Sequence, residues 1–242
     1  MSKKDTLYRS GDAPVKPFEF NQKVVDVFPD MIERSVPGYP LTISMISVMA
    51  NQYVQEHSNI YDLGCSLGAA SLAMQQCLDN KSCKIIAVDN SEAMIETCKQ
   101  TITDAKPGIE LEFVLQDIQQ TEIKQASVVV MNFTLQFIPK ADRLALLQKI
   151  YDGLLPGGVL ILSEKTVFEN DRENQILEQL HYQMKGLNGY EQMEIASKRE
   201  ALENVLVPES IQMHQDRLQQ AGFKQVYLWL QCLNFVSFLA IK

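Results

Sequence analysis

The 242-residue chain lacks any apolar run long enough to cross a membrane. Its longest apolar stretches, SVVVMNF and GVLIL, have the length of a β-strand, whereas a membrane-spanning helix needs about 20 apolar residues. The opening MSKKDTLYRSGDAP has no apolar segment behind its lysines, so we expect no secretory signal. We therefore expect a cytoplasmic protein without a membrane partner.

Cysteine and histidine are also scarce. The five cysteines are odd in number and form no C-x-x-C pair, which fits neither a disulfide framework nor a zinc site. The histidines at 57, 181 and 214 lack metal-ligand spacing, and we expect them to be on the surface or partly buried. The sequence predicts no metal ion.

Basic residues are outnumbered, with 22 Lys and Arg against 30 Asp and Glu, which gives a net charge of −8. This balance repels a phosphate backbone, so we expect no direct contact with nucleic acid. A small anion can still be bound by one or two buried arginines, because a local guanidinium–anion pair outweighs distant charges.

Strands and helices alternate from residue 59 onward. Apolar strand patterns at 59–63, 83–89, 109–115, 126–133 and 158–164 are separated by helical patterns at 69–78, 91–105 and 141–154. Such alternation predicts an α/β fold with a doubly wound parallel sheet, covered on both faces. Two strands at 224–231 and 233–242 follow almost directly on one another, so we expect them to be adjacent, with one antiparallel to the rest.

Helical segments lie before and within this core. A cap at about 20–56 carries helical patterns over 21–35 and 41–54, and an insertion at about 168–222 carries them over 171–202 and 208–221. We find no repeat, low-complexity tract or linker that would divide the chain. We therefore expect a single domain over residues 1–242.

The stretch NIYDLGCSLGAAS, residues 59–71, has the pattern of a strand, a glycine turn and a helix. Gly64 and Gly68 bracket the turn, where the missing Cβ permits positive φ and a close approach to a ligand. The second glycine comes four residues after the first, so the dinucleotide pattern G-x-G-x-x-G is not met. Taken alone, the stretch also fits a plain tight turn.

Acidic residues end the next two predicted strands. Asp89, followed by Asn90, can accept hydrogen bonds from both ribose hydroxyls of a nucleoside, and Asp117 can accept one from an adenine amino group while Ile118 packs on the ring. The alternatives are an aspartate that only precedes a helix-capping serine and an ordinary loop aspartate. Because open parallel sheets bind ligands at the carboxyl ends of their strands, the combination favours a nucleoside site.

The turn in LLPGGVLIL and the terminal hairpin KQVYLWLQCLNFVSFLAIK make residues 59–242 resemble the class I S-adenosylmethionine-dependent methyltransferase superfamily. The resemblance implies a Rossmann-like methyltransferase fold with a seven-stranded, mostly parallel sheet and an antiparallel last strand. It also implies that the glycine turn, with Cys65 and Ser66, holds the methionine end of S-adenosylmethionine. Asn132, after the fourth strand, cannot take a proton at neutral pH, so it is expected to position the ligand; a capping role is the alternative.

A closer resemblance runs over nearly the whole chain. FPDMIERSVPGY, YDLGCSLGAA, NFTLQF, LPGGVLILSEK and NGYEQMEIASKREALENV together resemble the carboxy-S-adenosyl-L-methionine synthases of the tRNA wobble-uridine 5-oxyacetate pathway. The resemblance implies conversion of S-adenosylmethionine and prephenate to carboxy-S-adenosylmethionine and phenylpyruvate. A separate enzyme would then use the product on tRNA. It also implies a homodimer.

The implied chemistry needs no protein base after the fourth strand. Prephenate would release carbon dioxide and hydroxide, the sulfonium methyl group would lose a proton, and the resulting ylide would capture the carbon dioxide. The protein would supply positioning and electrostatic stabilisation. Arg199 matches the family position that contacts the new carboxylate, and Tyr39 matches a family ligand contact. Without the resemblance, Arg199 would be expected to pair with Glu203 and Tyr39 to serve in packing.

Some residues depart from the predicted site or from the family pattern. Arg34 is expected to pair with Asp30, outside the site. Family aromatic residues are replaced at Leu230 and Leu233, and a basic residue at Gly186, which affects packing and dimer contacts more than chemistry. The rival functions are a conventional methyltransferase acting on a small acid, a non-catalytic S-adenosylmethionine-binding protein, and a nicotinamide oxidoreductase, which the glycine spacing opposes.

Overall fold

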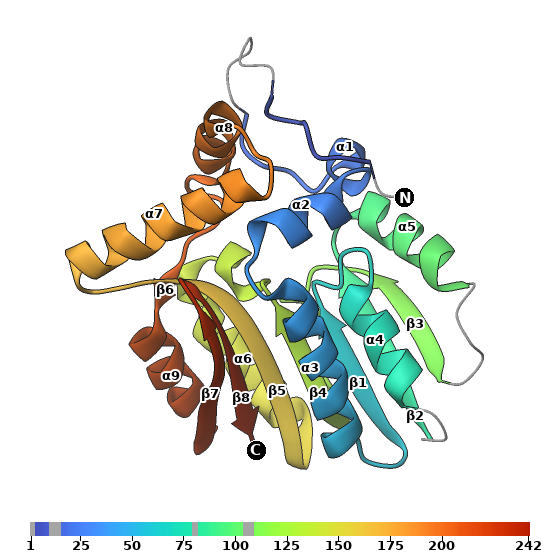
Figure 1. Cartoon of the computed structure of the whole chain (residues 1–242). Helices are drawn as coiled ribbons and strands as arrows, with labels where there is room; N and C mark the ends of the chain where they lie inside the picture. The colour runs from blue at the N-terminus through green and yellow to red at the C-terminus, as the bar shows by residue number, and fades with distance from the viewer. Residues whose placement is uncertain (1–2, 10–15, 79–81, 104–108) are drawn as a thin grey trace.

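The computed structural model describes residues 3–9, 16–78, 82–103 and 109–242. Its strands are β1 (Ser58–Leu63), β2 (Cys83–Asp89), β3 (Glu110–Leu115), β4 (Ala126–Asn132), β5 (Leu154–Val167), β6 (Glu209–Ser210), β7 (Gln225–Cys232) and β8 (Phe235–Ile241). They form one sheet in the order β3-β2-β1-β4-β5-β8-β7, with the two-residue β6 beside β5 (Figure 1). Strands β1 to β5 are parallel, and β8 is antiparallel to both β5 and β7. The predicted sheet and its antiparallel last strand are confirmed, and β6 is an addition that the sequence did not reveal.

The helices are α1 (Gln22–Val25), α2 (Phe28–Ser35), α3 (Tyr39–Tyr53), α4 (Ala69–Cys77), α5 (Glu92–Thr103), α6 (Lys140–Gly153), α7 (Asp171–Leu187), α8 (Gln192–Leu202) and α9 (Ile211–Gln220). A 3₁₀ turn, η1 (Leu135–Phe137), follows β4. Helices α3 and α4 cover one face of the sheet, and α6 and α9 cover the other. Helices α1, α2, α7 and α8 lie beyond the edge where the parallel strands end (Figure 1).

The buried strands supply both core layers because successive residues point to opposite faces. In β4, Val128 and Val130 pack with α3 and α4, while Val129 and Met131 pack with α6 and α9. All four side chains are fully buried. A strand covered on both faces must be apolar at every position, which explains its continuous apolar run.

Two predicted helices are each divided in the structure. The pattern over 21–35 forms α1 and α2, because Pro29 lacks an amide hydrogen and is favoured only in the first turn of a helix. The pattern over 171–202 forms α7 and α8, because Gly189 adopts a left-handed φ of 85° between them and Glu191 begins α8 with a capping box. These breaks turn α2 and α8 toward the carboxyl ends of the strands.

Candidate active site

A cavity of about 690 Å³ lies at the carboxyl ends of β1 to β5, next to α2, α7 and α8. This volume is within the range of small-molecule sites, roughly 300–1,000 Å³. All ten residues that the sequence analysis selected line it: Tyr39, Gly64, Cys65, Ser66, Asp89, Asn90, Asp117, Ile118, Asn132 and Arg199. The structure therefore brings them together, although their contacts with a ligand stay predictions.

The glycine turn after β1 has little room for other residues. Gly64 and Gly68 both have φ of 80°. A Cβ atom at Gly64 would lie 2.5 Å from the side chain of Thr134, and one at Gly68 would lie 2.5 Å from Sγ of Cys98. Glycine is thus needed at both positions for backbone conformation and for packing, and the turn keeps its main chain next to the cavity.

Asp89 connects the turn after β1 to the end of β2. Its carboxylate accepts hydrogen bonds of 2.9 Å from the backbone N–H groups of Ser66 and Ser91. Burial raises the pKa of Asp89, and these hydrogen bonds oppose the rise. The hydroxyl of Ser91 accepts a hydrogen bond from the N–H of Met94 in the first turn of α5. Ser91 thus caps this helix, as the alternative interpretation proposed, but Asp89 before it also lines the cavity.

The ends of β3 and β4 contribute the next part of the wall. Ile118 is buried, and Asp117 accepts a 2.7 Å hydrogen bond from the N–H of Gln119. Oδ1 of Asn132 is buried and has no hydrogen-bond partner among the described residues. A buried, unpartnered acceptor is costly, so Asn132 is suited to a donor group of a ligand. Tyr39 begins α3, and burial raises the pKa of its hydroxyl.

Asp62, which was not predicted from the sequence, also lines the cavity. Its Oδ2 accepts a 2.6 Å hydrogen bond from the hydroxyl of Ser71 and a 3.1 Å bond from the N–H of that residue. Burial, with a smaller contribution from the charge of Asp89, raises the pKa of Asp62 to about 6. A carboxylate between the apolar residues Tyr61 and Leu63, near the end of a predicted strand, was the signal that could have revealed it.

Cationic side chains line the part of the cavity formed by β5, α7 and α8: Lys165 near the end of β5, Lys185 in α7, and Lys198 and Arg199 in α8. Burial lowers the pKa of Lys185 to about 8 and that of Lys198 to about 7. Arg199 is exposed, and within the described ranges no carboxylate forms an ion pair with it, Glu203 included. The three lysines were not predicted because only the tertiary structure turns α7 and α8 toward the cavity.

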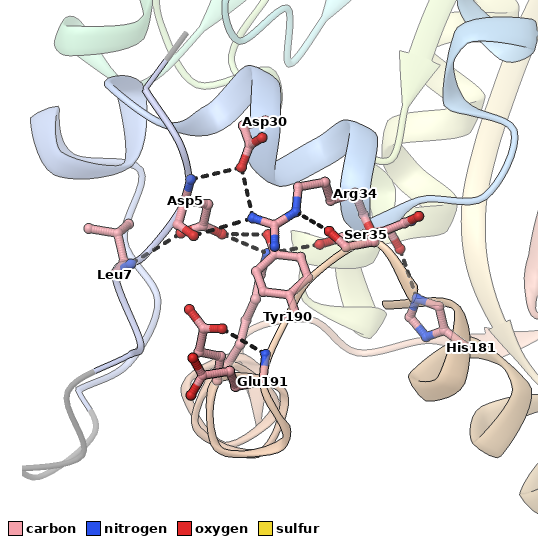
Figure 2. A network of polar contacts seen from close by, with 11 residues as sticks. Asp5, Leu7, Asp30, Arg34, Ser35, His181, Tyr190 and Glu191 are labelled. Atoms are coloured by element: carbon pink, nitrogen blue, oxygen red, sulfur yellow. Dashed lines mark hydrogen bonds and ion pairs between the residues drawn. The ribbon is translucent and has the colours of Figure 1, made fainter. Parts of the chain in front are cut away.

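A buried polar network fastens the N-terminal segment to the helical insertion (Figure 2). The predicted pair of Arg34 with Asp30 is confirmed at 2.9 Å, and the guanidinium also lies 3.8 Å above the ring of Tyr190. The hydroxyl of Tyr190 donates a 2.6 Å hydrogen bond to Asp5. These contacts hold α2 next to the loop before α8.

Two histidines are more buried than the sequence analysis expected. His181 and His214 are 6% and 1% exposed, and burial lowers the pKa of each to about 4. His181 lines the cavity, with its Nε2 2.8 Å from the carbonyl oxygen of Ser35. The sequence pattern indicated an amphipathic helix with His181 partly exposed. In the structure the ring of His181 packs edge-on against Phe235, which buries it.

Neither a metal-binding cluster nor a membrane-spanning helix is found among the residues that the structure describes. There, no group of three or more His, Cys, Asp or Glu side chains is arranged to hold a metal ion. No described helix combines the length and apolar character needed to cross a bilayer. The expectation of no metal stays a prediction.

Comparisons with known proteins show the family to which the chain belongs. A family model for a methyltransferase domain matches residues 60–158. The carboxy-S-adenosyl-L-methionine synthase of Aliivibrio fischeri is 49% identical over 242 residues, and that of Trichlorobacter lovleyi is 52% identical over 244 residues; each alignment covers 100% of both chains.

Solved structures show the same fold at low identity. A Methanococcus maripaludis protein described as a candidate S-adenosyl-L-methionine-dependent methyltransferase has a TM-score of 0.60 at 18% identity, covering 95% of this chain and 97% of its own. Human N-acetylserotonin methyltransferase in complex with S-adenosylmethionine has a TM-score of 0.57 at 18% identity, covering 91% of this chain and 55% of its own. On the full-length identities above, the chain belongs to the carboxy-S-adenosyl-L-methionine synthase family, a family of transferases with the Rossmann-like methyltransferase fold.

Proposed function

We propose that the chain converts S-adenosylmethionine and prephenate to carboxy-S-adenosylmethionine and phenylpyruvate. The observation that carries this proposal is the division of charge within one cavity. Carboxylates line the ends of β1 to β3, whereas four cations, Lys165, Lys185, Lys198 and Arg199, line the part formed by β5, α7 and α8, together with the carboxylate of Glu203 after α8. One end suits a nucleoside with a sulfonium cation, and the other suits carboxylates.

The nucleoside end would hold S-adenosylmethionine through the residues predicted from the sequence. Asp89 would accept hydrogen bonds from the ribose hydroxyls, and Asp117 would accept one from the adenine amino group beside Ile118. Gly64, Cys65 and Ser66 would face the methionine part. Asn132 would offer its unpartnered Oδ1 to a donor such as the amino group of the ligand.

The other end would hold the carboxylates during the reaction. Prephenate, with charge −2, would break into phenylpyruvate with charge −1, neutral carbon dioxide and hydroxide. The hydroxide would accept a proton from the sulfonium methyl group and become water, and the methyl carbon would form a bond to carbon dioxide. Arg199, which has no ion-pair partner among the described residues, would then pair with the new carboxylate.

The test is mass spectrometry of the sulfonium products after incubation with both substrates. We expect a species one carboxyl group heavier than S-adenosylmethionine, together with phenylpyruvate, and a loss of roughly 10- to 100-fold in kcat/KM for Arg199→Ala. Arg172→Ala, which changes an exposed arginine of α7 that does not line the cavity, should match the wild type. Unchanged S-adenosylmethionine, or methylation of an added small acid, would overturn the proposal.

We also propose that a single domain spans the chain and that the protein acts in the cytoplasm. Its product would serve a separate tRNA-modifying enzyme, and this protein would not itself bind nucleic acid.

We further propose that the protein is a homodimer. Apolar side chains exposed on α7 and α8 support the dimer: Ile176, Leu180, Leu187 and Met193. Leu187 is 89% exposed, and a second copy could cover this surface. Light scattering at micromolar concentration should give twice the chain mass of 27.4 kDa; a monomer would contradict the dimer.

A further inference from the structure

The end of the cavity formed by β5, α7 and α8 contains three lysines that the predicted ligand contacts do not use. Lys165, Lys185 and Lys198 come from three different elements and all line the cavity. Lys185 and Lys198 are each 6% exposed. Their ammonium groups lie 5.3 and 5.6 Å from the centre of the Tyr190 ring. The charge of Lys165 also acts on Lys185 and on His181 of the cavity wall, so all three amines belong to one end of the cavity.

These lysines have few anionic partners. Lys198 lies 3.9 Å from Oδ2 of Asp5, an atom that also accepts the hydroxyl of Tyr190. In the part of the chain that the structure describes, no carboxylate lies within 4.0 Å of the ammonium group of Lys165 or Lys185. An ammonium group that is removed from water without a paired anion is unfavourable, and neighbouring ammonium groups add repulsion.

The remaining charged groups around the lysines do not remove this imbalance. The negative charge of Glu178 attracts the ammonium group of Lys165, and that of Glu194 attracts Lys185, but both carboxylates lie beyond ion-pair distance. Glu194 also accepts the N–H of Glu191 in the capping box of α8. Arg34 adds a further positive charge, although Asp30 pairs with it.

A second observation points to the same end of the cavity. Nδ1 of His181 is buried and has no partner among the described residues. Because the carbonyl oxygen of Ser35 can only accept, Nε2 carries the proton of the neutral ring, and Nδ1 is left as an acceptor. A ligand at this end would therefore meet ammonium donors and one acceptor for a hydroxyl group.

We infer that Lys165 and Lys185, assisted by Lys198, form a subsite for the two carboxylates of a hydroxylated dicarboxylate, with Nδ1 of His181 facing its hydroxyl group. The inference deepens the proposed function and rests on it, since prephenate is a dianion of this class. It separates two roles within the cavity: the lysines bind the incoming dicarboxylate, and Arg199 binds the carboxylate that forms on the sulfonium ligand.

The binding test uses isothermal titration calorimetry in the presence of S-adenosylhomocysteine, which has no methyl group to react. We expect Lys165→Met and Lys185→Met each to weaken prephenate binding by roughly 10- to 100-fold, with a smaller loss for the monocarboxylate phenylpyruvate. Lys185→Arg, which keeps the charge, should restore most of the affinity. Lys140→Met, which changes an exposed lysine outside the cavity, should behave as the wild type.

Affinity for S-adenosylhomocysteine reports whether each variant is folded. Where a Lys→Met variant no longer binds S-adenosylhomocysteine, the Lys→Gln variant at the same position is used in its place. Prephenate affinity that is unchanged in the folded Lys165 and Lys185 variants would overturn the subsite. Turnover by the same wild-type protein separates this outcome from failure of the proposed function. Binding of prephenate that depends on the lysines, without any carboxylated product, would contradict the proposed reaction and support the subsite.

Discussion

The hydroxyl of Tyr190 donates a 2.6 Å hydrogen bond to Oδ2 of Asp5, a residue 185 positions earlier in the chain. Asp5 is 1% exposed and its backbone N–H donates to Asp30 in α2, so the N-terminal segment, the cap and the insertion meet at this point (Figure 2). Lys198, on the cavity wall, lies 3.9 Å from the same Asp5 oxygen. The geometry of the cationic end of the cavity thus depends on a segment far away in sequence.

Tyr190→Phe should lower the stability of the protein and loosen its N-terminal segment. The change removes a hydrogen bond to a buried carboxylate, a loss of roughly 1.5–3 kcal/mol. Thermal unfolding should therefore shift down by roughly 3–12 °C for a chain of this size. Tyr227→Phe, at a tyrosine that is 52% exposed on β7, provides the control. Equal midpoints for the two variants would contradict this role of Tyr190.

Asp89→Asn should weaken binding of S-adenosylmethionine and of S-adenosylhomocysteine. The carboxylate accepts two backbone N–H bonds and still lines the cavity, whereas an amide has one acceptor oxygen and would direct an N–H group toward donors. We expect affinity to fall by roughly 10- to 100-fold in calorimetric titration. Asp152→Asn, at an exposed position in α6, is the matched control. Wild-type affinity in the Asp89 variant would rule out its nucleoside contact.

Gly64→Ala and Gly186→Ala should have opposite effects. At Gly64 a Cβ atom would lie 2.5 Å from Thr134 on a backbone with φ of 80°, so we expect loss of stability and of ligand binding. At Gly186, within α7, a Cβ atom would meet nothing within 4 Å, and alanine should raise stability by roughly 0.5–1 kcal/mol. Chemical denaturation of both variants measures the contrast, and tolerance of alanine at position 64 would refute the packing argument.

Glu164→Gln should change how stability depends on pH. Burial raises the pKa of Glu164 to about 8, against 4.5 for an ordinary glutamate, although the charge of Arg143 opposes the rise. Between these values the folded state holds a proton that the unfolded state has released, so the wild type loses stability as pH rises. Its free energy of unfolding should fall relative to the variant by at most about 1.4 kcal/mol per pH unit.

Denaturant titrations of the wild type and the Glu164 variant at pH 5.5 and pH 7.5 measure this difference. Glu122→Gln, at an exposed glutamate, should leave the pH dependence of stability as it is in the wild type. If the difference in free energy of unfolding between the wild type and Glu164→Gln were the same at both pH values, Glu164 would have the same pKa in the folded and unfolded chains.

Local pattern was sufficient to predict the parallel sheet and the part of the cavity next to it. The ends of consecutive parallel strands meet at one edge, so the positions of Gly64, Asp89, Asp117 and Asn132 along the sequence already place them side by side. Asp62 was missed although it lies in the same stretch, because its strand was interpreted only as buried and apolar.

The cationic end could not be predicted in this way. Lys165, Lys185 and Lys198 are ordinary lysines in the sequence, and the helical periodicity of α7 and α8 does not say which neighbour each face meets. The sequence by itself determined the alternation of strands and helices and the glycine turn, because these depend on residues that are close together along the chain, and it located the predicted nucleoside contacts at the strand ends. Only the tertiary structure decided where the insertion packs, because the Asp5, Arg34 and Tyr190 contacts that hold it join segments at opposite ends of the chain.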